Sequence, residues 1–355
     1  MDFSIASILT LDGLTNGAIY ALLGMGIVLV FTVTRVIFIP QGEFVAYGAL
    51  TLAIFQTGKV PGTVWLLIIL AAVAALMELV TTWRHRGGNA AAAAPALKAA
   101  LKTFVIPAVI CAVSAWAGPR NLPLAVQALL TICIVTAFGP LVYRVAYQSL
   151  AGSSSLVLLI VSVGVHFAMT GLGLLFFGAE GFRNPSFWDV RFALGPLNLS
   201  GQTIIIFGAS AALIVLLWLF FERSLYGKAL RATAVNRVGA RLVGIRPART
   251  ALMAYGSASL LAGLIGILIG PVTTMYYDSG FIIGLKAFVA AIIGGLVSYP
   301  VTALGALAVG LVESYASFWS GALKDVIVFS LLIPVLMLRS YLSRHQEEEQ
   351  EEVDE

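Results

Sequence analysis

Residues 222–250 read ERSLYGKALRATAVNRVGARLVGIRPART and lie between two long apolar runs. This segment carries seven Lys or Arg residues and one carboxylate in a chain that is only 11% charged. Loops rich in Lys and Arg remain on the cytoplasmic side of a membrane, as the positive-inside bias expects. The segment is therefore predicted to be a cytoplasmic loop, and it is too long for a simple hairpin.

The composition is that of an integral membrane protein. Hydrophobic residues make up 60% of the 355 positions, and the mean hydropathy is +0.98. The apolar runs have the length of about 20 residues that a helix needs to cross a hydrocarbon layer of about 30 Å, whereas strands of a β-barrel are short and alternating. The sequence thus predicts an all-α polytopic membrane protein.

The net charge of +4 combines a basic body with an acidic tail. Seven of the 17 acidic residues lie in Glu347–Glu355, which is predicted to be a solvated, disordered tail. A nucleic-acid-binding protein gathers its basic residues on a folded surface, whereas here they flank the apolar runs. The charge pattern therefore indicates the lipid membrane as partner and excludes nucleic acid.

Eleven apolar runs predict transmembrane or re-entrant helices, at residues 8–34, 40–57, 62–83, 103–117, 122–142, 155–177, 201–221, 251–271, 282–297, 301–318 and 325–341. Counting outward from a cytoplasmic 222–250 leaves the N-terminus outside and the C-terminus inside. The same count places every other basic cluster inside, namely Arg35, Arg84, Arg86, Lys98, Lys102, Arg144, Arg339 and Arg344.

Residues 1–346 are predicted to form one transmembrane domain, followed by the tail 347–355. The stretch from Arg84 to Lys102 contains Gly87-Gly88-Asn89 and consecutive alanines, which is typical of a linker that leads into a short helix. The longest external loop, Ala179–Ser200, contains Trp188 and Gly195-Pro196, and its aromatic residues suit a membrane interface. This loop either touches an external partner or only caps the bundle.

Charged residues within spans are costly unless they face the bundle interior or water, so each one is a candidate for function. Glu43 and Lys286 are the strongest candidates. Glu78 lies close to Arg84 and the inner interface, where its carboxylate reaches solvent. Asp278, Glu313 and Asp325 are expected near the outer boundary, and His166 is expected to be a packing residue.

Two pairs of runs have the features of an inverted repeat. In each, a long run (8–34 or 251–271) precedes a shorter one with a charge near its start, and the two short runs point in opposite directions. The mid-span pair Gly294-Gly295 and the nearby Pro300 predict a helix that breaks at membrane depth. The pairs Gly13–Gly17 and Gly266–Gly270 predict close helix packing only.

No catalytic or metal-binding template is present. The sequence has no Cys/His dyad at useful spacing, no nucleophilic serine elbow, no HExxH motif and no carboxylate-rich metal cluster. It also has no Walker A sequence. The chain is therefore not predicted to be an enzyme, and any nucleotide energy must be supplied by another chain.

The loop 222–250 has its own predicted structure. A helix-compatible stretch begins at Leu225, breaks at Gly239, and stops at Gly244 and Pro247. On a continuous helix Val235, Val238 and Leu242 share one face, while Arg237 and Arg241 share another. Such a helix either lies on the lipid surface or docks into a groove on a partner protein.

At this point the residues resemble the membrane permease subunits of bacterial ABC importers for branched-chain amino acids, the LivH type. The matching pieces occur in family order and cover most of the chain. They are Asn16–Leu22, Gln41–Glu43, Tyr143–Tyr147, Gly227–Ala232, Leu242–Ile245, Lys286–Phe288, Gly294-Gly295 and Lys324–Val326.

The resemblance implies that residues 227–246 form a coupling segment that docks on an ATP-binding subunit. The residues that correspond are Gly227, Arg231, Ala232, Arg237, Gly239, Arg241 and Gly244. It also implies two ABC ATPase subunits, a second homologous permease and a periplasmic solute-binding protein as partners. ATP and Mg²⁺ would be bound by those partner subunits, and this chain would bind no cofactor or metal itself.

The resemblance further implies an alternating-access path for a small organic solute through the inner membrane. Its expected lining residues are Gln41, Gly42, Glu43, Lys286, Gly294 and Gly295. Branched-chain or other aliphatic amino acids are the expected solutes, with urea, amides and aromatic acids as alternatives. A self-contained secondary transporter or channel, and a structural scaffold, remain alternative interpretations.

The sequence departs from the family pattern at three places. Phe38-Ile39-Pro40-Gln41 stands where Asn-Phe-Ala-His is common, which alters a polar contact near the path. Val235-Asn236 replaces residues that are often acidic, which puts the details of ATPase pairing in doubt. About forty residues, 83–122, are predicted to be an inserted helical hairpin that preserves the downstream topology.

Overall fold

The computed structural model describes residues 3–85, 90–120, 122–194, 197–337 and 341. The Gly87-Gly88-Asn89 linker, the Gly195-Pro196 turn and the acidic tail 347–355 lie outside these residues, as do Arg86, Arg339 and Arg344. The predictions made for them are therefore untested.

Each predicted apolar run overlaps a helix, which confirms the all-α polytopic fold class. The described elements are α1 (Phe3–Thr34), α2 (Gln41–Gln56), α3 (Gly62–His85), α4 (Ala90–Ala117), α5 (Leu124–Val142), a π turn (Tyr143–Tyr147), a 3-10 turn (Gln148–Leu150), α6 (Ser155–Phe177), β1 (Arg191–Leu194), β2 (Leu197–Ser200), α7 (Gly201–Arg223), α8 (Leu225–Val235), α9 (Arg237–Leu242), α10 (Pro247–Ile269), α11 (Ser279–Ile293), α12 (Tyr299–Trp319) and α13 (Lys324–Ser330).

The structure divides the predicted runs into long spans and short segments. Within the described residues, eight helices are long and apolar enough to cross a membrane. The helices α2, α11 and α13 have only 16, 15 and 7 residues. A helix rises about 1.5 Å per residue, so none of these three reaches across a layer of about 30 Å on its own.

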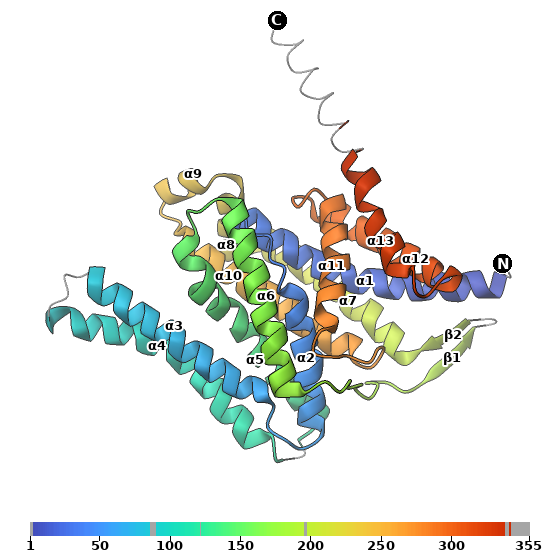
Figure 1. The fold of residues 1–355 in the computed structure, drawn as a ribbon, viewed down its shortest axis with the longest axis horizontal. Coiled ribbons are helices and arrows are strands. Elements are labelled where there is room, and N and C mark those ends of the chain that lie inside the picture. Colours follow the sequence, from blue (N-terminus) through green and yellow to red (C-terminus); the bar gives the residue numbers. More distant parts are fainter. Residues whose placement is uncertain (1–2, 86–89, 121, 195–196, 338–340, 342–355) are drawn as a thin grey trace, which may run out of the picture.

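The long helix α1 runs through the middle of the fold and packs against α10, α11 and α12 (Figure 1). Gly13 lies against the backbone of Leu311 on α12, and Gly17 lies against that of Leu307. Gly310 of α12 faces both glycines in return. Small residues allow helices in lipid to approach this closely. The predicted packing role of the Gly13–Gly17 pair is confirmed.

The second predicted pair, Gly266 and Gly270 on α10, also lies at close contacts. Gly266 packs against Gly48 of α2, and Gly270 packs against Asn184 of the external loop. Asn184 is buried and its side-chain amide donates to the carbonyl oxygen of Ala49 over 3.2 Å. The helices α2 and α10 and the external loop are thus joined at one end of the molecule.

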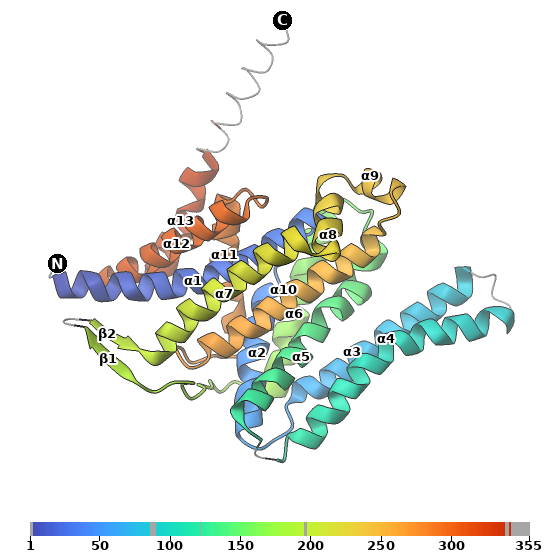
Figure 2. The same cartoon turned by 180° about the vertical axis from the view of Figure 1, so that it is seen from behind.

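Helices α3 and α4 form an antiparallel hairpin that extends away from the core (Figure 2). The prediction of a hairpin within 83–122 needs correction, because a single long helix, α4, occupies most of that region and returns along α3. The alanine run 90–94 favours this long helix, since alanine has the highest helix propensity. The hairpin therefore consists of α3 and α4, and its origin as an insertion is untested.

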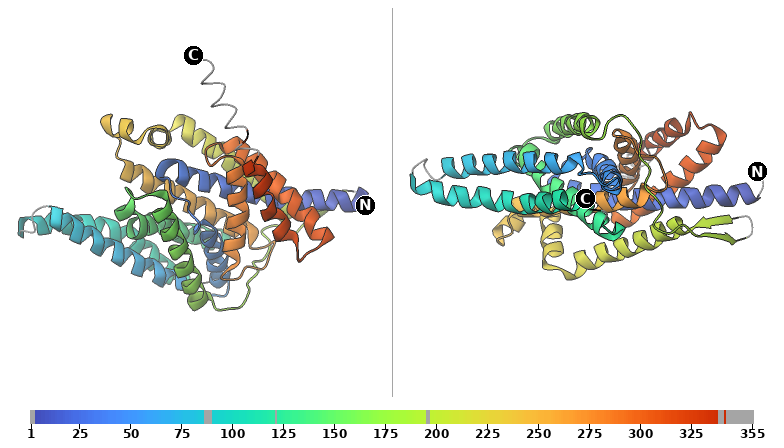
Figure 3. Two further views of the ribbon diagram at one scale, coloured as in Figure 1. Left: turned by 45° about the horizontal axis from the view of Figure 1, so that its top comes forward. Right: turned by 90° about the horizontal axis from the view of Figure 1, so that it is seen from below.

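The external loop 179–200 ends in a small β-hairpin. Strand β1 pairs antiparallel with β2, with Arg191 opposite Ser200. Before the hairpin, Phe182 and Met275 exchange two backbone hydrogen bonds of 2.9 and 2.8 Å. The loop is therefore fastened to the segment that leads into α11, while the hairpin projects beyond the start of α7 (Figure 3).

Several of the described segments that were predicted to face the cytoplasm gather at one end of the molecule. This basic end comprises the last turns of α1 and α7, the turn 148–153, α8 with α9, and the turn 294–298. Arg35, Arg231 and Val297 line one hollow there, and Gln148 and Arg241 line another. The gathering agrees with the predicted topology, although the orientation in a membrane is itself untested.

Candidate functional site

The short helices α2 and α11 both start inside the bundle. The chain reaches these two starts from opposite ends of the molecule. Near the end of α1, Leu29 and Val33 pack against Ala254, which lies near the start of α10, so these two long helices run antiparallel. Helix α2 follows α1 at the basic end, and α11 follows α10 at the other end. This is the arrangement that the inverted repeat predicts.

The two short helices cross at three glycines near their starts. Gly42 of α2 lies against Gly280 and Gly284 of α11, and a Cβ atom on Gly42 would strike the carbonyl oxygen of Gly280. The amino-terminal ends of helices carry unpaired N–H groups and a partial positive charge. Two such ends therefore meet in the interior, and Gly42 lies at their contact.

Glu43 follows Gly42 and is completely buried. Its Oε1 atom lies 3.0 Å from Nδ1 of His166 on α6. This separation makes the imidazole of His166 the partner of Oε1, whereas the second carboxylate oxygen, Oε2, has no donor among the described residues. Burial of a carboxylate oxygen without a donor is costly. Glu43 is therefore an acceptor that a proton or a cationic group would stabilise.

Gln41 provides a second buried acceptor in the first turn of α2. Its side-chain nitrogen donates to the carbonyl oxygen of Leu23 on α1 over 3.3 Å. Its Oε1 atom has no donor among the residues that the structure describes. The first turn of α2 thus holds unpaired oxygens on two neighbouring polar side chains.

His166 belongs to this site, contrary to its predicted packing role. Its ring stacks on that of Phe281 on α11, with centroids 4.6 Å apart and planes inclined by 30°. It therefore contacts both short helices at once. The sequence held a signal for this position, because the buried residues of α6 recur every three or four positions, at Leu158, Ser162, His166, Met169, Gly173 and Phe177.

Lys286 lies in a different cluster, which joins α11 to α12 and α13. Its ammonium donates to Oε1 of Glu313 over 2.6 Å and lies 2.9 Å from Oδ1 of Asp325. The second Glu313 oxygen accepts a hydrogen bond of 2.6 Å from the hydroxyl of Tyr20 on α1. Lys286 and Glu313 are buried, while the side chain of Asp325 is 39% exposed. The charge of Lys286 is therefore compensated within the protein.

The predicted path residues are not brought together at one place. Lys286 follows Gly284 by two positions, which turns it by about 200° around α11 and away from α2. Gly294 and Gly295 lie at the far end of α11, where Gly295 has φ +70° and Gly294 packs against Thr302 of α12. Gln41, Gly42 and Glu43 therefore lie together in the first turn of α2, with Gln41 directed to α1 and Glu43 to α6, and the other three residues lie elsewhere.

The structure gives partners to the other charges in the spans. Glu78 pairs with Arg144 at 3.2 Å, and Arg144 also donates to the hydroxyl of Thr103 on α4. Glu313 and Asp325 pair with Lys286, and their predicted place near the outer boundary stays a prediction. In both cases the partner is remote in sequence, so linear spacing did not indicate it.

The loop 222–250 folds into α8 and α9. The side chain of Ser224 accepts a hydrogen bond from the N–H of Gly227 over 2.8 Å, which caps α8. Gly244 adopts φ +85° after α9, a conformation that glycine adopts without strain, and Pro247 is the first residue of α10. The predicted stop at Gly244 and Pro247 is confirmed.

The predicted break at Gly239 is wrong by three positions. The chain breaks at Asn236, which is extended with φ −147°, and Gly239 lies within α9. The Asn236 side chain accepts hydrogen bonds from the N–H groups of Val238 and Gly239, over 3.0 and 2.8 Å. Such a cap stabilises a helix start by about 1 kcal/mol, and it therefore determines the boundary.

Helix α8 is fastened to the end of α7. Gly227 is buried so closely against the backbone of Phe220 and Phe221 that a Cβ atom would collide. Arg231 donates to the carbonyl oxygen of Phe221 over 2.7 Å and pairs with Glu222 at 3.1 Å. Arg231 therefore bonds within the chain and is not free for a partner in this conformation.

The outward surface of α8 and α9 carries an apolar face and two hollows. Val235, Val238 and Leu242 are 83%, 66% and 83% exposed. The predicted continuous helix does not hold them on one face, because the chain breaks at Asn236 between Val235 and Val238. One hollow of about 480 Å³ is lined by Lys228, Arg231, Ala232, Val235, Asn236, Gly239, Ala240 and Val243. Arg237 and Arg241 line the second, of about 570 Å³, beside the turn at Gln148. Exposed apolar residues rimmed by basic ones are typical of a protein-docking surface.

Comparisons with known proteins give a consistent result. The family model described as branched-chain amino acid transport system / permease component matches residues 87–337. The high-affinity branched-chain amino acid transport system permease protein BraD of Pseudomonas aeruginosa is 31% identical over 220 residues, which cover 59% of this chain and 70% of BraD.

Two further relatives carry similar names. The corresponding permease protein LivH of Escherichia coli is 30% identical over 216 residues, which cover 58% of this chain and 70% of LivH. A probable branched-chain amino acid transport permease protein LivH of Methanocaldococcus jannaschii is 30% identical over 156 residues, covering 41% of this chain and 50% of the relative. No solved structure matches the chain.

Proposed function

Since the chain belongs to the branched-chain amino acid transport permease family, we propose that it is the inner-membrane permease subunit of an ABC importer for branched-chain or other aliphatic amino acids. Two ABC ATPase subunits bind ATP and Mg²⁺ and supply the energy. A second homologous permease and a periplasmic solute-binding protein complete the assembly. This multi-pass chain supplies half of the transport path.

The observation that carries the proposal is the buried carboxylate of Glu43 at the crossing of α2 and α11, whose Oε2 atom has no donor among the described residues. A zwitterionic amino acid matches this site chemically, because its ammonium group supplies a donor to the carboxylate of Glu43. Its carboxylate suits the N–H groups at the starts of the two short helices. Glu43, Gln41 and Gly42 are therefore the proposed path residues.

The site is closed in this conformation, since Gln41 and Glu43 are both fully buried. Entry of a solute requires α2 and α11 to separate at Gly42 and Gly280. Because the two helices enter from opposite ends, each can move with its own half of the bundle. Rigid-body movement of two packed halves is an established form of switching. Alternate opening to the two sides follows from that geometry.

The segment α8–α9 is the proposed coupling element. Helix α8 is held to α7 by Gly227 and Arg231, so a push on its outward face moves α7 with it. Arg237 reaches the carbonyl oxygen of Ala151 in the turn after α5 over 3.5 Å. Closure of the ATPases would therefore be transmitted to two parts of the bundle. Ala232 and Gly239 lie in the groove that receives the partner.

The path proposal is tested with Glu43→Gln in the assembled transporter, with Glu180→Gln on the external surface as control. A hydrogen bond to a charged group contributes about 1.5–3 kcal/mol, so uptake of radiolabelled leucine is expected to fall about 10- to 100-fold in the first variant. The loss of uptake should exceed any loss of stability, measured as melting temperature, and the subunit composition should stay unchanged. Normal uptake by an assembled Glu43→Gln protein would contradict the assignment of Glu43 to the transport path.

Leucine transport by this chain alone in liposomes would favour a self-contained transporter.

The coupling proposal is tested with the double change Arg237→Glu and Arg241→Glu. Membrane insertion should be the same as in the wild type. The number of solute molecules transported per ATP hydrolysed should fall at least about tenfold, since reversal of charged rim contacts costs a few kcal/mol. The control is Arg84→Glu with Lys102→Glu, which changes the same net charge on the α3–α4 hairpin. If transport per ATP hydrolysed is unchanged, α8 and α9 do not couple the ATPases to transport, and their basic residues only fix the membrane topology.

A further inference from the structure

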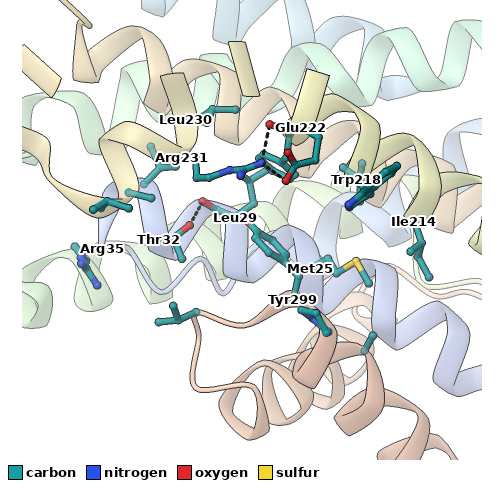
Figure 4. A pocket seen from close by; sticks show the side chains of 18 residues that line it. Met25, Leu29, Thr32, Arg35, Ile214, Trp218, Glu222, Leu230, Arg231 and Tyr299 are labelled. Carbon is teal, nitrogen blue, oxygen red and sulfur yellow. Dashed lines mark hydrogen bonds and ion pairs between the residues drawn. The ribbon is translucent and has the colours of Figure 1, made fainter. Parts of the chain in front are cut away.

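A deep groove lies at the basic end, between the last turns of α1 and α7, helix α8 and the start of α12 (Figure 4). Its volume is about 630 Å³, within the range of about 300–1,000 Å³ that is usual for ligand sites. The site proposed for transport lies elsewhere, at the crossing of α2 and α11. The walls of this groove are mostly apolar, with Leu29, Val33, Ile214, Leu217, Trp218, Phe221, Leu230, Tyr299 and Ala303.

The rim of the groove has an excess of positive charge. Arg35, Arg231 and Glu222 line it, and Glu222 pairs with Arg231 at 3.1 Å. Arg35 lies above the ring of Phe31, 5.8 Å from its centroid, and makes no ion pair with a described residue. Its backbone has φ +63°, which a non-glycine residue rarely adopts and which directs the chain away from the helix at this point. One guanidinium therefore remains uncompensated at the mouth.

The groove opens onto an apolar face of α7 that the rest of the chain leaves uncovered. Helix α7 is the least buried of the eight long apolar helices, with 11% of its most apolar window inside the protein. The side chains of Trp218 and Ile214, which line the groove, are still 59% and 37% exposed. The apolar wall of the groove therefore continues into the face that α7 presents to the hydrocarbon layer. An acyl chain can enter from the bilayer without crossing water.

We propose that this groove binds an anionic phospholipid. One acyl chain lies between α1, α7 and α12, and the phosphate lies beside Arg35 at the rim. Basic pockets between membrane helices on the cytoplasmic side are suited to anionic lipid headgroups, because the apolar body and the positive rim match the two parts of the lipid. Helix α8 supplies one wall through Leu230 and Ala234, so the lipid also supports α8 against α1.

The test uses the purified full chain in a neutral detergent and native mass spectrometry. Phosphatidylglycerol and phosphatidylcholine with identical acyl chains are titrated separately. A phosphate near the membrane surface gains about 1 kcal/mol per basic residue, so phosphatidylglycerol should bind about fivefold more tightly. Arg35→Gln should abolish this preference and leave the binding of phosphatidylcholine unchanged. The matched control, Arg84→Gln on α3, should retain the preference.

A second variant tests the acyl-chain part of the site without changing charge. Ala303→Trp fills the groove and should lower the binding of both lipids at least fivefold, whereas Ala308→Trp on the lipid-facing side of α12 should not.

Equal binding of the two lipids to the wild type would overturn the proposal. Displacement of phosphatidylglycerol by inorganic phosphate alone would also overturn it, because the acyl chain would then be unnecessary. A change in cross-linking between two permeases by Ala303→Trp, with lipid binding intact, would instead identify the groove as a subunit interface.

Discussion

The two buried charge clusters of this protein differ in the partners of their glutamates. Lys286 is compensated by Glu313 and Asp325, and both oxygens of Glu313 accept hydrogen bonds. Glu43 has His166 at 3.0 Å from Oε1, but its Oε2 atom has no donor among the described residues. Both glutamates are buried, so burial alone does not distinguish them.

The difference indicates that the two clusters have different functions. A buried ion pair with complete hydrogen bonding adds little net stability but is costly to break. The Lys286 cluster therefore holds α13, α12 and α1 against α11, as a structural joint. A buried carboxylate oxygen that lacks a donor is instead expected where a ligand supplies one. The crossing of α2 and α11 has the properties of a binding site, and the Lys286 cluster does not.

The largest effect is expected from Lys286→Met. Removal of the ammonium leaves Glu313 and Asp325 facing each other without a cation, and breaking a buried pair in this way costs about 3–5 kcal/mol. The free energy of unfolding in detergent micelles, followed by circular dichroism, should fall by that amount. Lys324→Met, on the neighbouring turn, is the matched control and should change stability by less than about 0.5 kcal/mol.

The double variant Lys286→Met with Glu313→Gln sharpens this test. It removes one of the two stranded carboxylates, so it should recover part of the lost stability. A loss that is the same in the single and double variants would show that Lys286 contributes through packing rather than through its charge. Leucine uptake by the fraction that folds should remain near that of the wild type.

A smaller loss of stability is expected from His166→Leu. The variant leaves a single buried carboxyl group, which one proton can neutralise, so the cost should be about 1–3 kcal/mol. The same unfolding measurement applies, with Phe167→Leu on the exposed side of α6 as control. Equal losses in His166→Leu and Lys286→Met would remove the distinction between the two clusters.

The number and type of elements were largely predictable. Apolar runs from 8–34 to 325–341 correspond to helices, because the cost of unpaired backbone groups in lipid forces nearly every apolar stretch into helix. The two departures follow local rules that the sequence already contained. Asn236 is a better helix cap than Gly239, and the alanines after residue 89 extend α4.

The candidate site was predictable only in part. Gln41, Gly42 and Glu43 were expected on the path, and the structure places them together at a crossing. Lys286 was expected beside them, but its position on α11 turns it toward Glu313 and Asp325. His166 was expected to be a packing residue, because its partner lies 123 positions earlier in the chain and on another helix.

The sequence by itself determined the membrane class, the spans and the common side of the basic segments. These properties depend on hydrophobicity and charge, which act residue by residue along the chain. Only the tertiary structure decided which buried charge meets which partner. Each residue turns a helix by about 100°, so one or two positions separate a residue at the α2–α11 crossing from one in a structural joint. The contacts of Gly42, Glu43 and Lys286 are therefore set by helix packing and not by their order in the chain.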